Sequence, residues 1–237
     1  MKKELTSQEN LAKYKKNLGW IADLLCPCYF FGEQIPEDTK FVISNHIQFF
    51  DPIFLIMNID KYMRFVSKKE TRDFPIIGKI ADKIGAIHID REKEGGDLTA
   101  IKAILRAIKN NEDVMIFPEG TRNKVDMNIQ PLKEGTALFA LRTGAMVLPI
   151  MIYKKHKVFR RNYLYVGKPF DFKEFSAGKK VDATLIEEAN VIMRDKMIEA
   201  QAFMNEYMAN DGAKKIKKLY KEQRKLHKKK KFVVKID

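Results

Sequence analysis

Cysteine is scarce in this chain of 237 residues, which has only Cys26 and Cys28. The two are too close together to form a comfortable disulfide, and no second cysteine pair or nearby histidine completes a zinc site. So few thiols are typical of a reducing, cytosolic compartment. We therefore expect no disulfide framework and no bound metal, and interpret the pair as two small apolar residues.

Long hydrophobic runs are also missing. The longest apolar stretch, from Leu18 to Phe31, is interrupted by Asp23 and Pro27 and is shorter than the roughly 20 residues that a membrane-spanning helix needs. The first lysines are followed by polar residues, so we expect no secretory signal. No internal repeat is present either.

Positive charge, by contrast, is abundant. The net charge of +14 predicts an anionic partner, such as acidic phospholipid headgroups, a phosphate-rich small molecule or nucleic acid. Much of this charge lies in residues 211–237, where apolar residues are interleaved with lysines from Lys214 to Lys231. This helix or tail can adsorb to an anionic membrane, bind RNA or remain solvated.

Residues 1–35 contain a stripe of apolar residues at helical spacing, followed by a cluster of aromatics. The stripe comprises Leu11, Tyr14, Leu18, Ile21, Leu25 and Cys28, and the aromatics are Trp20, Tyr29, Phe30 and Phe31. The pattern resembles an amphipathic helix lying in a membrane interface, although the same pattern is found in helices that pack on their own domain.

Between these ends, residues 36–210 alternate between strand and helix patterns, which is typical of α/β proteins. We predict one domain with a mixed, largely parallel sheet flanked by helices, plus the amphipathic N-terminal helix and the basic C-terminal segment. The expected strands are 41–44, 62–66, 86–89, 113–117, 146–152 and 162–166. The expected helices are one from Pro52, then 75–84, 97–110, 133–143 and 182–207.

A histidine and an aspartate follow the first of these strands, at His46 and Asp51. A histidine acts as a general base when a carboxylate fixes its tautomer and leaves the other ring nitrogen free. The alternative is that Asp51 only caps the helix that begins at Pro52. Of the other three histidines, His88 lies within an apolar strand and is expected to be structural, while His156 and His227 lie in basic, exposed contexts.

A second polar segment, Phe117 to Arg122, follows the strand 113–117. Gly120 lets the backbone approach a ligand, and Arg122 offers a planar fork of donors that matches a phosphate. Glu119 can orient that fork or accept a hydrogen bond from a substrate hydroxyl. The alternative is a surface turn with an ordinary ion pair between Glu119 and Arg122.

With these residues in view, the chain resembles the family of glycerolipid acyltransferases that includes 1-acylglycerol-3-phosphate O-acyltransferase, the bacterial phosphatidate-forming enzyme. The resemblance covers about residues 20–170 and rests on four blocks in the family's order. These are Asn45-His46 with Asp51; Lys68-Lys69-Glu70 with Phe74 to Gly78; Phe117 to Arg122; and Val147 to Ile150.

The resemblance implies a role for each matching residue. It makes His46 the general base and Asp51 its orienting partner, while Glu119, Gly120, Thr121 and Arg122 help to bind the acceptor's phosphate. Asn45 and Lys68 are further candidates for substrate contact, and Lys68 or a backbone N–H near Gly120 is a candidate oxyanion donor. Gln48 stands where the family often has Ser or Thr, and Asn123 stands where it often has Ser. These departures bear on the acceptor more than on the reaction.

The activity so implied is transfer of a fatty acyl group from acyl-CoA or acyl carrier protein to 1-acylglycerol-3-phosphate, without a cofactor. Glycerol-3-phosphate or another lysophospholipid is the alternative acceptor. A basic module that binds membrane or nucleic acid without catalysis is the alternative from another class, with nucleic acid the less expected ligand. The expected location is the cytoplasmic face of the cell membrane, as a peripheral protein on an anionic surface.

Overall fold

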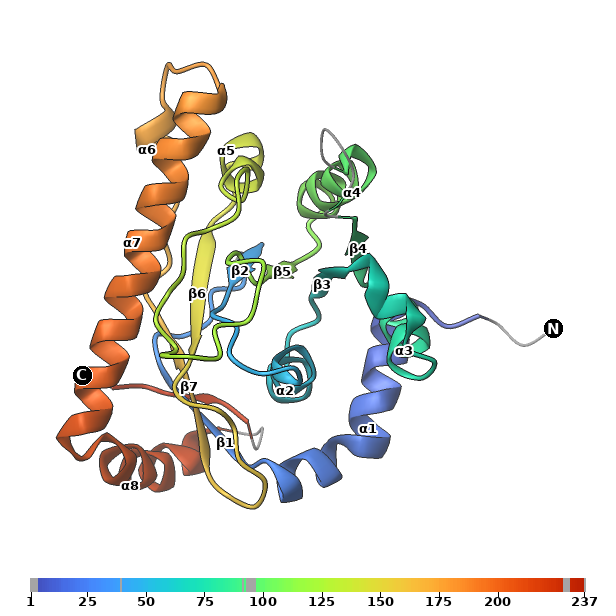
Figure 1. Ribbon diagram of the computed structural model, residues 1–237. Helices are drawn as coiled ribbons and strands as arrows, with labels where there is room; N and C mark the ends of the chain where they lie inside the picture. The colour runs from blue at the N-terminus through green and yellow to red at the C-terminus, as the bar shows by residue number, and fades with distance from the viewer. Residues whose placement is uncertain (1–3, 39, 91, 93–96, 228–230, 237) are drawn as a thin grey trace.

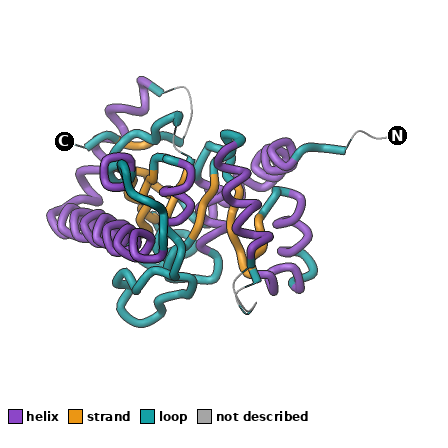
Figure 2. Tube along the Cα trace, turned by 90° about the horizontal axis from the view of Figure 1, so that it is seen from above, coloured by secondary structure: helices purple, strands orange, loops and turns teal. Residues whose placement is uncertain are grey.

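A mixed sheet with helices on both faces forms the centre of the protein (Figures 1 and 2). The computed structural model describes residues 4–38, 40–90, 92, 97–227 and 231–236. In these residues, the sheet has eight strands in the order β4-β3-β5-β2-β6-β7-β1-β8. They are β1 (Cys28–Gly32), β2 (Phe41–Ile43), β3 (Arg64–Lys68), β4 (Ile87–Ile89), β5 (Val114–Ile116), β6 (Val147–Ile152), β7 (Asn162–Val166) and β8 (Val233–Val234).

The helices alternate with the strands over most of the chain. They are α1 (Ser7–Leu25), α2 (Asp51–Asn58), α3 (Ile77–Lys83), α4 (Leu98–Lys109), α5 (Leu138–Thr143), α6 (Lys173–Ser176), α7 (Ala183–Tyr207) and α8 (Ala213–Gln223). Short helical turns lie at Lys69–Asp73, Met208–Gly212 and Arg224–Leu226. The predicted single α/β domain with a largely parallel sheet is confirmed, although the helix expected from residue 133 begins only at Leu138.

Five neighbouring strands, β4, β3, β5, β2 and β6, all run parallel. Their carboxyl ends therefore meet at one edge of the sheet, which is where α/β proteins gather their functional side chains. β7 turns back antiparallel to β6, and β1 and β8 follow the direction of β7. The direction of the sheet thus reverses once, immediately beside β6.

Two apolar clusters form the core, one on each face of the sheet, because successive side chains of a strand point to opposite faces. α4, α5, α7 and α8 cover one face, while α2 covers the other. The start of α4 is set locally: Asp97 caps it by accepting from the backbone N–H of Thr99 and Ala100, each at 3.1 Å.

Residues 1–35 form two different elements. Helix α1 ends at Leu25, and Cys28–Gly32 is strand β1, in which Phe30 and Phe31 are buried. Periodicity alone does not distinguish a helix from a strand in a short apolar run interrupted by one proline. The sequence pattern therefore could not separate α1 from β1. Within the described residues, α1 buries only Leu11, and no helix combines the length and apolar character needed to cross a membrane.

The basic segment 211–237 is also built into the fold. Ile216 of α8 and Val234 of β8 are fully buried, and β8 pairs in parallel with β1 at Phe30 and Phe31. Residues 228–230 and 237 lie outside the described residues. A deletion of residues 213–237 would therefore remove core contacts together with the lysines, and only substitutions of exposed lysines can test their charge separately.

Candidate active site

The side chains singled out in the sequence follow the carboxyl ends of the parallel strands. His46 follows β2, and Glu119 follows β5, the neighbour of β2 on one side. His156 follows β6, the neighbour of β2 on the other side. Lys68 ends β3, one strand farther away. The sheet order brings three loops from distant parts of the sequence to one place.

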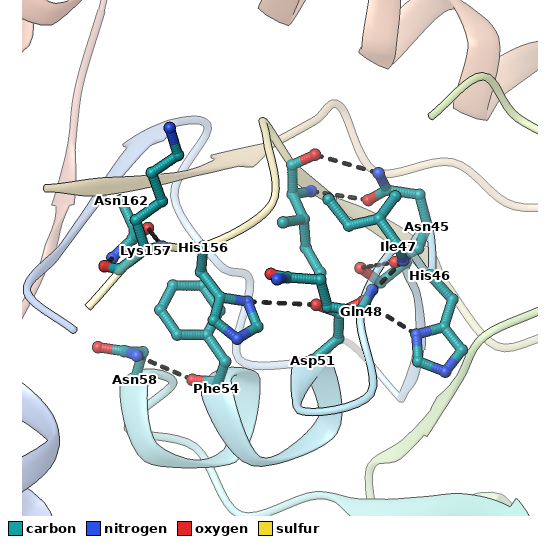
Figure 3. A network of polar contacts seen from close by, with 12 residues as sticks. Asn45, His46, Ile47, Gln48, Asp51, Phe54, Asn58, His156, Lys157 and Asn162 are labelled. Carbon is teal, nitrogen blue, oxygen red and sulfur yellow. Dashed lines mark hydrogen bonds and ion pairs between the residues drawn. The ribbon is translucent and has the colours of Figure 1, made fainter. Parts of the chain in front are cut away.

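His46 and Asp51 form the pair that the sequence suggested. His46 Nδ1 lies 2.9 Å from Asp51 Oδ2, and the His46 ring stacks on Phe117 with centroids 4.3 Å apart. The same Asp51 oxygen accepts the backbone N–H of Ile47 and of Gln48, each at 2.7 Å. Asp51 is the first residue of α2, but its carboxylate points back into the preceding loop and not to the helix, so it is not a helix cap (Figure 3).

These contacts fix the protonation of the pair. Burial raises the pKa of the Asp51 carboxyl, but the nearby His156 imidazole and hydrogen bonds from His46, Gln48 and Ile47 outweigh it and hold the pKa below its ordinary value. An ionised Asp51 accepts a hydrogen bond from the Nδ1–H of His46. His46 Nε2 is then the unprotonated nitrogen of the neutral ring, and it makes no hydrogen bond to the described residues. This nitrogen is available to accept a proton.

Glu119 does not orient Arg122, contrary to the sequence-based interpretation. Its side chain is buried, with Oε1 accepting the backbone N–H of His46 and Oε2 that of Gln130, both at 3.0 Å. The backbone N–H of Asn123 donates to the carbonyl oxygen of His46 at 2.8 Å. The loop after β5 therefore holds the His46 peptide from both sides. Burial raises the pKa of Glu119, and the hydrogen bonds from the two N–H groups offset only part of this rise.

Thr121 and Arg122 are exposed at the end of this loop, as phosphate-binding residues must be. The Arg122 guanidinium lies over the ring of Phe49, 5.5 Å from its centroid, so it extends toward the loop that carries His46. Gly120 adopts a positive φ of 67°, and its N–H donates to the carbonyl of Phe117 at 3.0 Å. The Gly120 N–H is therefore engaged in the turn, which argues against it as the oxyanion donor.

Asn45 makes a different contact from the one expected, whereas the role of Lys68 stays a prediction. Asn45 is 1% exposed, and its side-chain amide exchanges two hydrogen bonds with the backbone of Ile152, at 2.7 and 3.1 Å. It joins the ends of β2 and β6, and does not face a substrate. Lys68 is exposed, and its side chain makes no hydrogen bond or ion pair with His46 or Asp51 in the described residues.

His156 is the functional candidate that the sequence did not reveal. It was expected in an exposed context, but its side chain is only 10% exposed and its Nδ1 lies 3.4 Å from Asp51 Oδ1. The surrounding lysines suggested exposure. Its place after β6, next to the strand that precedes His46, was the signal that could have indicated it.

A sizeable cavity lies elsewhere on the protein. It measures about 440 Å³ and is lined by Arg64, Lys69, Arg72, His88 and Asp90, among others, beside β4. His88 is structural there, as predicted, bonded to Ser67 at 2.9 Å and Asp82 at 3.0 Å. Among the described residues, no three Cys, His, Asp or Glu side chains are grouped as metal ligands. The side chains grouped around His46 identify the candidate active site better than cavity size does.

The double hydrogen bond of Glu119 leads to a testable expectation. Glu119→Gln places an amide NH₂ against one of the two buried N–H groups, which then loses its acceptor. We expect the free energy of unfolding to fall by about 1–3 kcal/mol. Denaturant unfolding measures this, with Glu134→Gln at an exposed position as the control, expected to stay within about 0.5 kcal/mol of wild type. Equal stability of Glu119→Gln and wild type would contradict the role given to this carboxylate.

Comparison with known proteins agrees with this geometry. The family model described as Acyltransferase matches residues 29–153. The 1-acyl-sn-glycerol-3-phosphate acyltransferase of Bacillus subtilis is 32% identical over 155 residues, 61% of this chain and 73% of that protein. Those of Cocos nucifera and Helicobacter pylori are 33% and 30% identical, over 66% and 60% of this chain, which spans 51% and 64% of their lengths.

The crystal structure of the 1-acyl-sn-glycerophosphate (LPA) acyltransferase PlsC from Thermotoga maritima has the same fold. The TM-score is 0.55 at 22% sequence identity, and the match covers 81% of this chain and 78% of that one. The family match includes His46, Asp51 and the segment Phe117 to Arg122. The chain therefore belongs to the acyltransferase family that includes the 1-acyl-sn-glycerol-3-phosphate acyltransferases.

Proposed function

We propose that this protein transfers a fatty acyl group from an acyl thioester to the free hydroxyl of 1-acylglycerol-3-phosphate and so forms phosphatidate. The observation that carries the proposal is the His46–Asp51 pair, with Nδ1 bonded at 2.9 Å and Nε2 open. The names of the relatives support this acceptor. Acyl-CoA and acyl carrier protein both fit as donors, since either supplies the thioester.

The chemistry follows from the orientation of the His46 ring. Nε2 takes the proton of the acceptor hydroxyl while the hydroxyl oxygen attacks the thioester carbonyl. Asp51 stabilises the imidazolium that forms. The tetrahedral intermediate then collapses: the carbon–sulfur bond breaks, an ester remains, and the imidazolium returns the proton to the departing thiolate. General-base catalysis of this kind contributes about 10²- to 10⁴-fold. No acyl-enzyme intermediate is needed, because the thioester is already activated.

Arg122 is the proposed contact for the acceptor phosphate. It is exposed and has no carboxylate partner among the described residues, so its guanidinium can bind a phosphate through two parallel hydrogen bonds. It stacks on Phe49, a residue that closely follows His46 in the chain. Thr121 adds a hydroxyl beside the guanidinium. A phosphate held there fits both a lysophosphatidate and the alternative, glycerol-3-phosphate.

We also propose that the protein associates peripherally with an anionic membrane, at its cytoplasmic face. In Figure 1, α8, the loop after β6 and the C-terminal end of α1 lie at the lower end of the molecule. Val158 and Phe159 of that loop are 56% and 69% exposed, and Trp20 and Leu24 of α1 are 65% and 60% exposed. Five basic residues flank the loop tip: Lys154, Lys155, Lys157, Arg160 and Arg161. Exposed apolar side chains with basic neighbours suit an anionic bilayer surface.

The first test of the proposed function removes the base. We expect His46→Ala to lower acyl transfer by about 10²- to 10⁴-fold, and Asp51→Asn to impair it because the ring loses its fixed tautomer. Product formation from 1-acylglycerol-3-phosphate and acyl-CoA, followed by mass spectrometry, measures this. His227→Ala is the matched control and should retain activity. Near-normal turnover by a folded His46→Ala protein would rule the mechanism out.

A pH series checks that Asp51→Asn is interpreted correctly. The pKa of Asp51 in the folded protein is below its ordinary value, so its ionised form stabilises the fold. That contribution is complete above the unfolded pKa of about 3.9 and is lost as the pH falls through the folded value. We expect the wild type to be more stable than Asp51→Asn at neutral pH and the difference to shrink in acid.

The phosphate contact is tested by changing its geometry while keeping its charge. Arg122→Lys retains the positive charge but loses the two-pronged contact, so we expect KM for 1-acylglycerol-3-phosphate to rise by about tenfold while KM for the donor changes little. Arg142→Lys, on an exposed position of α5, is the control. If Arg122→Lys raises KM equally for acceptors with and without a phosphate, Arg122 does not bind the phosphate.

The membrane proposal predicts a loss of binding when surface charge is removed. Lys217, Lys218 and Lys221 are exposed on α8, and their joint replacement by Gln should weaken binding to anionic vesicles at least about tenfold at low salt. The control replaces Lys102, Arg106 and Lys109 on α4. Vesicle sedimentation measures both, and high salt should reproduce the α8 variant. Unchanged binding by the α8 variant would make RNA the next ligand to test.

A further inference from the structure

The Asp51 carboxylate has two oxygens with very different surroundings. Oδ2 accepts from His46 Nδ1 and from two backbone N–H groups. Oδ1 is buried, and in the described residues it has no partner at ordinary hydrogen-bond distance. The polar atom facing it is Nδ1 of His156, at 3.4 Å (Figure 3). That nitrogen is itself buried and has no other partner in the part of the chain that the structure describes.

The ring of His156 is placed by packing. It stacks on Phe54 of α2, with centroids 4.9 Å apart and planes inclined by 13°, and Phe54 lies one helical turn after Asp51. Asn162 fixes the rest of the loop, because its side chain accepts from the N–H of Lys157 at 2.9 Å and donates to the carbonyl of Arg160 at 2.9 Å. The stack on Phe54 fixes the plane of the His156 imidazole, and the loop fixes the distance between this ring and Asp51.

The energetic reason for this contact is the cost of burying an unpaired polar atom. A buried acceptor without a donor costs about 1–3 kcal/mol, and more when it is charged. Asp51 Oδ1 and His156 Nδ1 remove this cost for each other only when Nδ1 carries the proton. The 3.4 Å separation is about half an ångström longer than a common N–H···O bond, so a small shift of the loop closes it.

We propose that His156 is a positioning residue: as the Nδ1–H tautomer it donates to Asp51 Oδ1 and prevents the carboxylate from rotating away from His46. Asp51 is then held between two imidazoles, one that reacts and one that does not. The inference rests on the proposed acyl transfer, because its catalytic value depends on His46 acting as the base. His156 does not touch the substrate in this scheme.

Two substitutions separate the hydrogen bond from the packing. His156→Phe keeps the stack on Phe54 and deletes the nitrogen, while His156→Asn places an amide NH₂ close to the position of Nδ1. We expect His156→Phe to lower kcat about 10- to 100-fold with little change in either KM, and His156→Asn to recover most of that loss. His227→Phe is the matched control, since His227 stacks on Phe232 at 4.1 Å and has no carboxylate partner among the described residues, and it should leave kcat unchanged. Wild-type kcat in His156→Phe, or equal losses in both His156 variants, would overturn the proposal.

A measurement on the wild-type protein is independent of turnover. With ¹⁵N-labelled histidine, NMR identifies which ring nitrogen carries the proton near neutral pH, and resonances are assigned with His46→Ala and the His156 variants. The expected result is a protonated Nδ1 on both His46 and His156. An unprotonated Nδ1 on His156 would refute the inference even in an active enzyme. Conversely, an inactive wild type with both Nδ1 atoms protonated would refute the acyl-transfer proposal and leave the His156 contact established.

Discussion

The buried carboxylate of Glu119 is the interaction on which the rest of the site depends. It accepts the N–H of His46, which lies 73 positions earlier in the chain, and that of Gln130, so one carboxylate joins the loop after β2 to the loop after β5. The return bond from Asn123 to the carbonyl of His46 completes the connection. The position of His46 is therefore set by the loop after β5 as much as by its own strand. In the Glu-Gly-Thr-Arg sequence, the glutamate side chain binds the protein's own backbone and the arginine side chain is exposed.

Asp51 and Glu119 are buried carboxyl groups that both bond to His46, and their pKa values shift in opposite directions. The nearby His156 imidazole, the hydrogen bond from His46 and two backbone N–H groups lower the pKa of Asp51 despite its burial, while burial raises the pKa of Glu119, which accepts from two N–H groups among the described residues. The number of donors decides the outcome, because each one offsets part of the cost of removing the charge from water. Asp51 is thus suited to stabilise an imidazolium, whereas Glu119 has only a structural role.

What the sequence could predict was local. The α/β alternation, the caps at Asp97 and Asp182 and the His46–Asp51 pair all depend on residues within a few positions of one another. Glu119, His156 and β8 depend on contacts between distant segments, which no periodicity records. The lysines around His156 indicated exposure correctly for themselves but not for the histidine, because alternate residues of a loop beside a strand end face different ways. The strand order supplies the missing information.

The short strand β8 also determines what the edge of the sheet offers to other molecules. Without it, β1 would present the unpaired backbone of Phe30 and Phe31, an apolar edge on which a second chain can add a strand. A two-residue strand covers that edge and is itself too short to recruit another. The neighbouring Lys231 is tied to Asp23 at 2.6 Å, so charge borders the seam. β8 therefore occupies an edge of β1 that would otherwise be open to pairing with another strand.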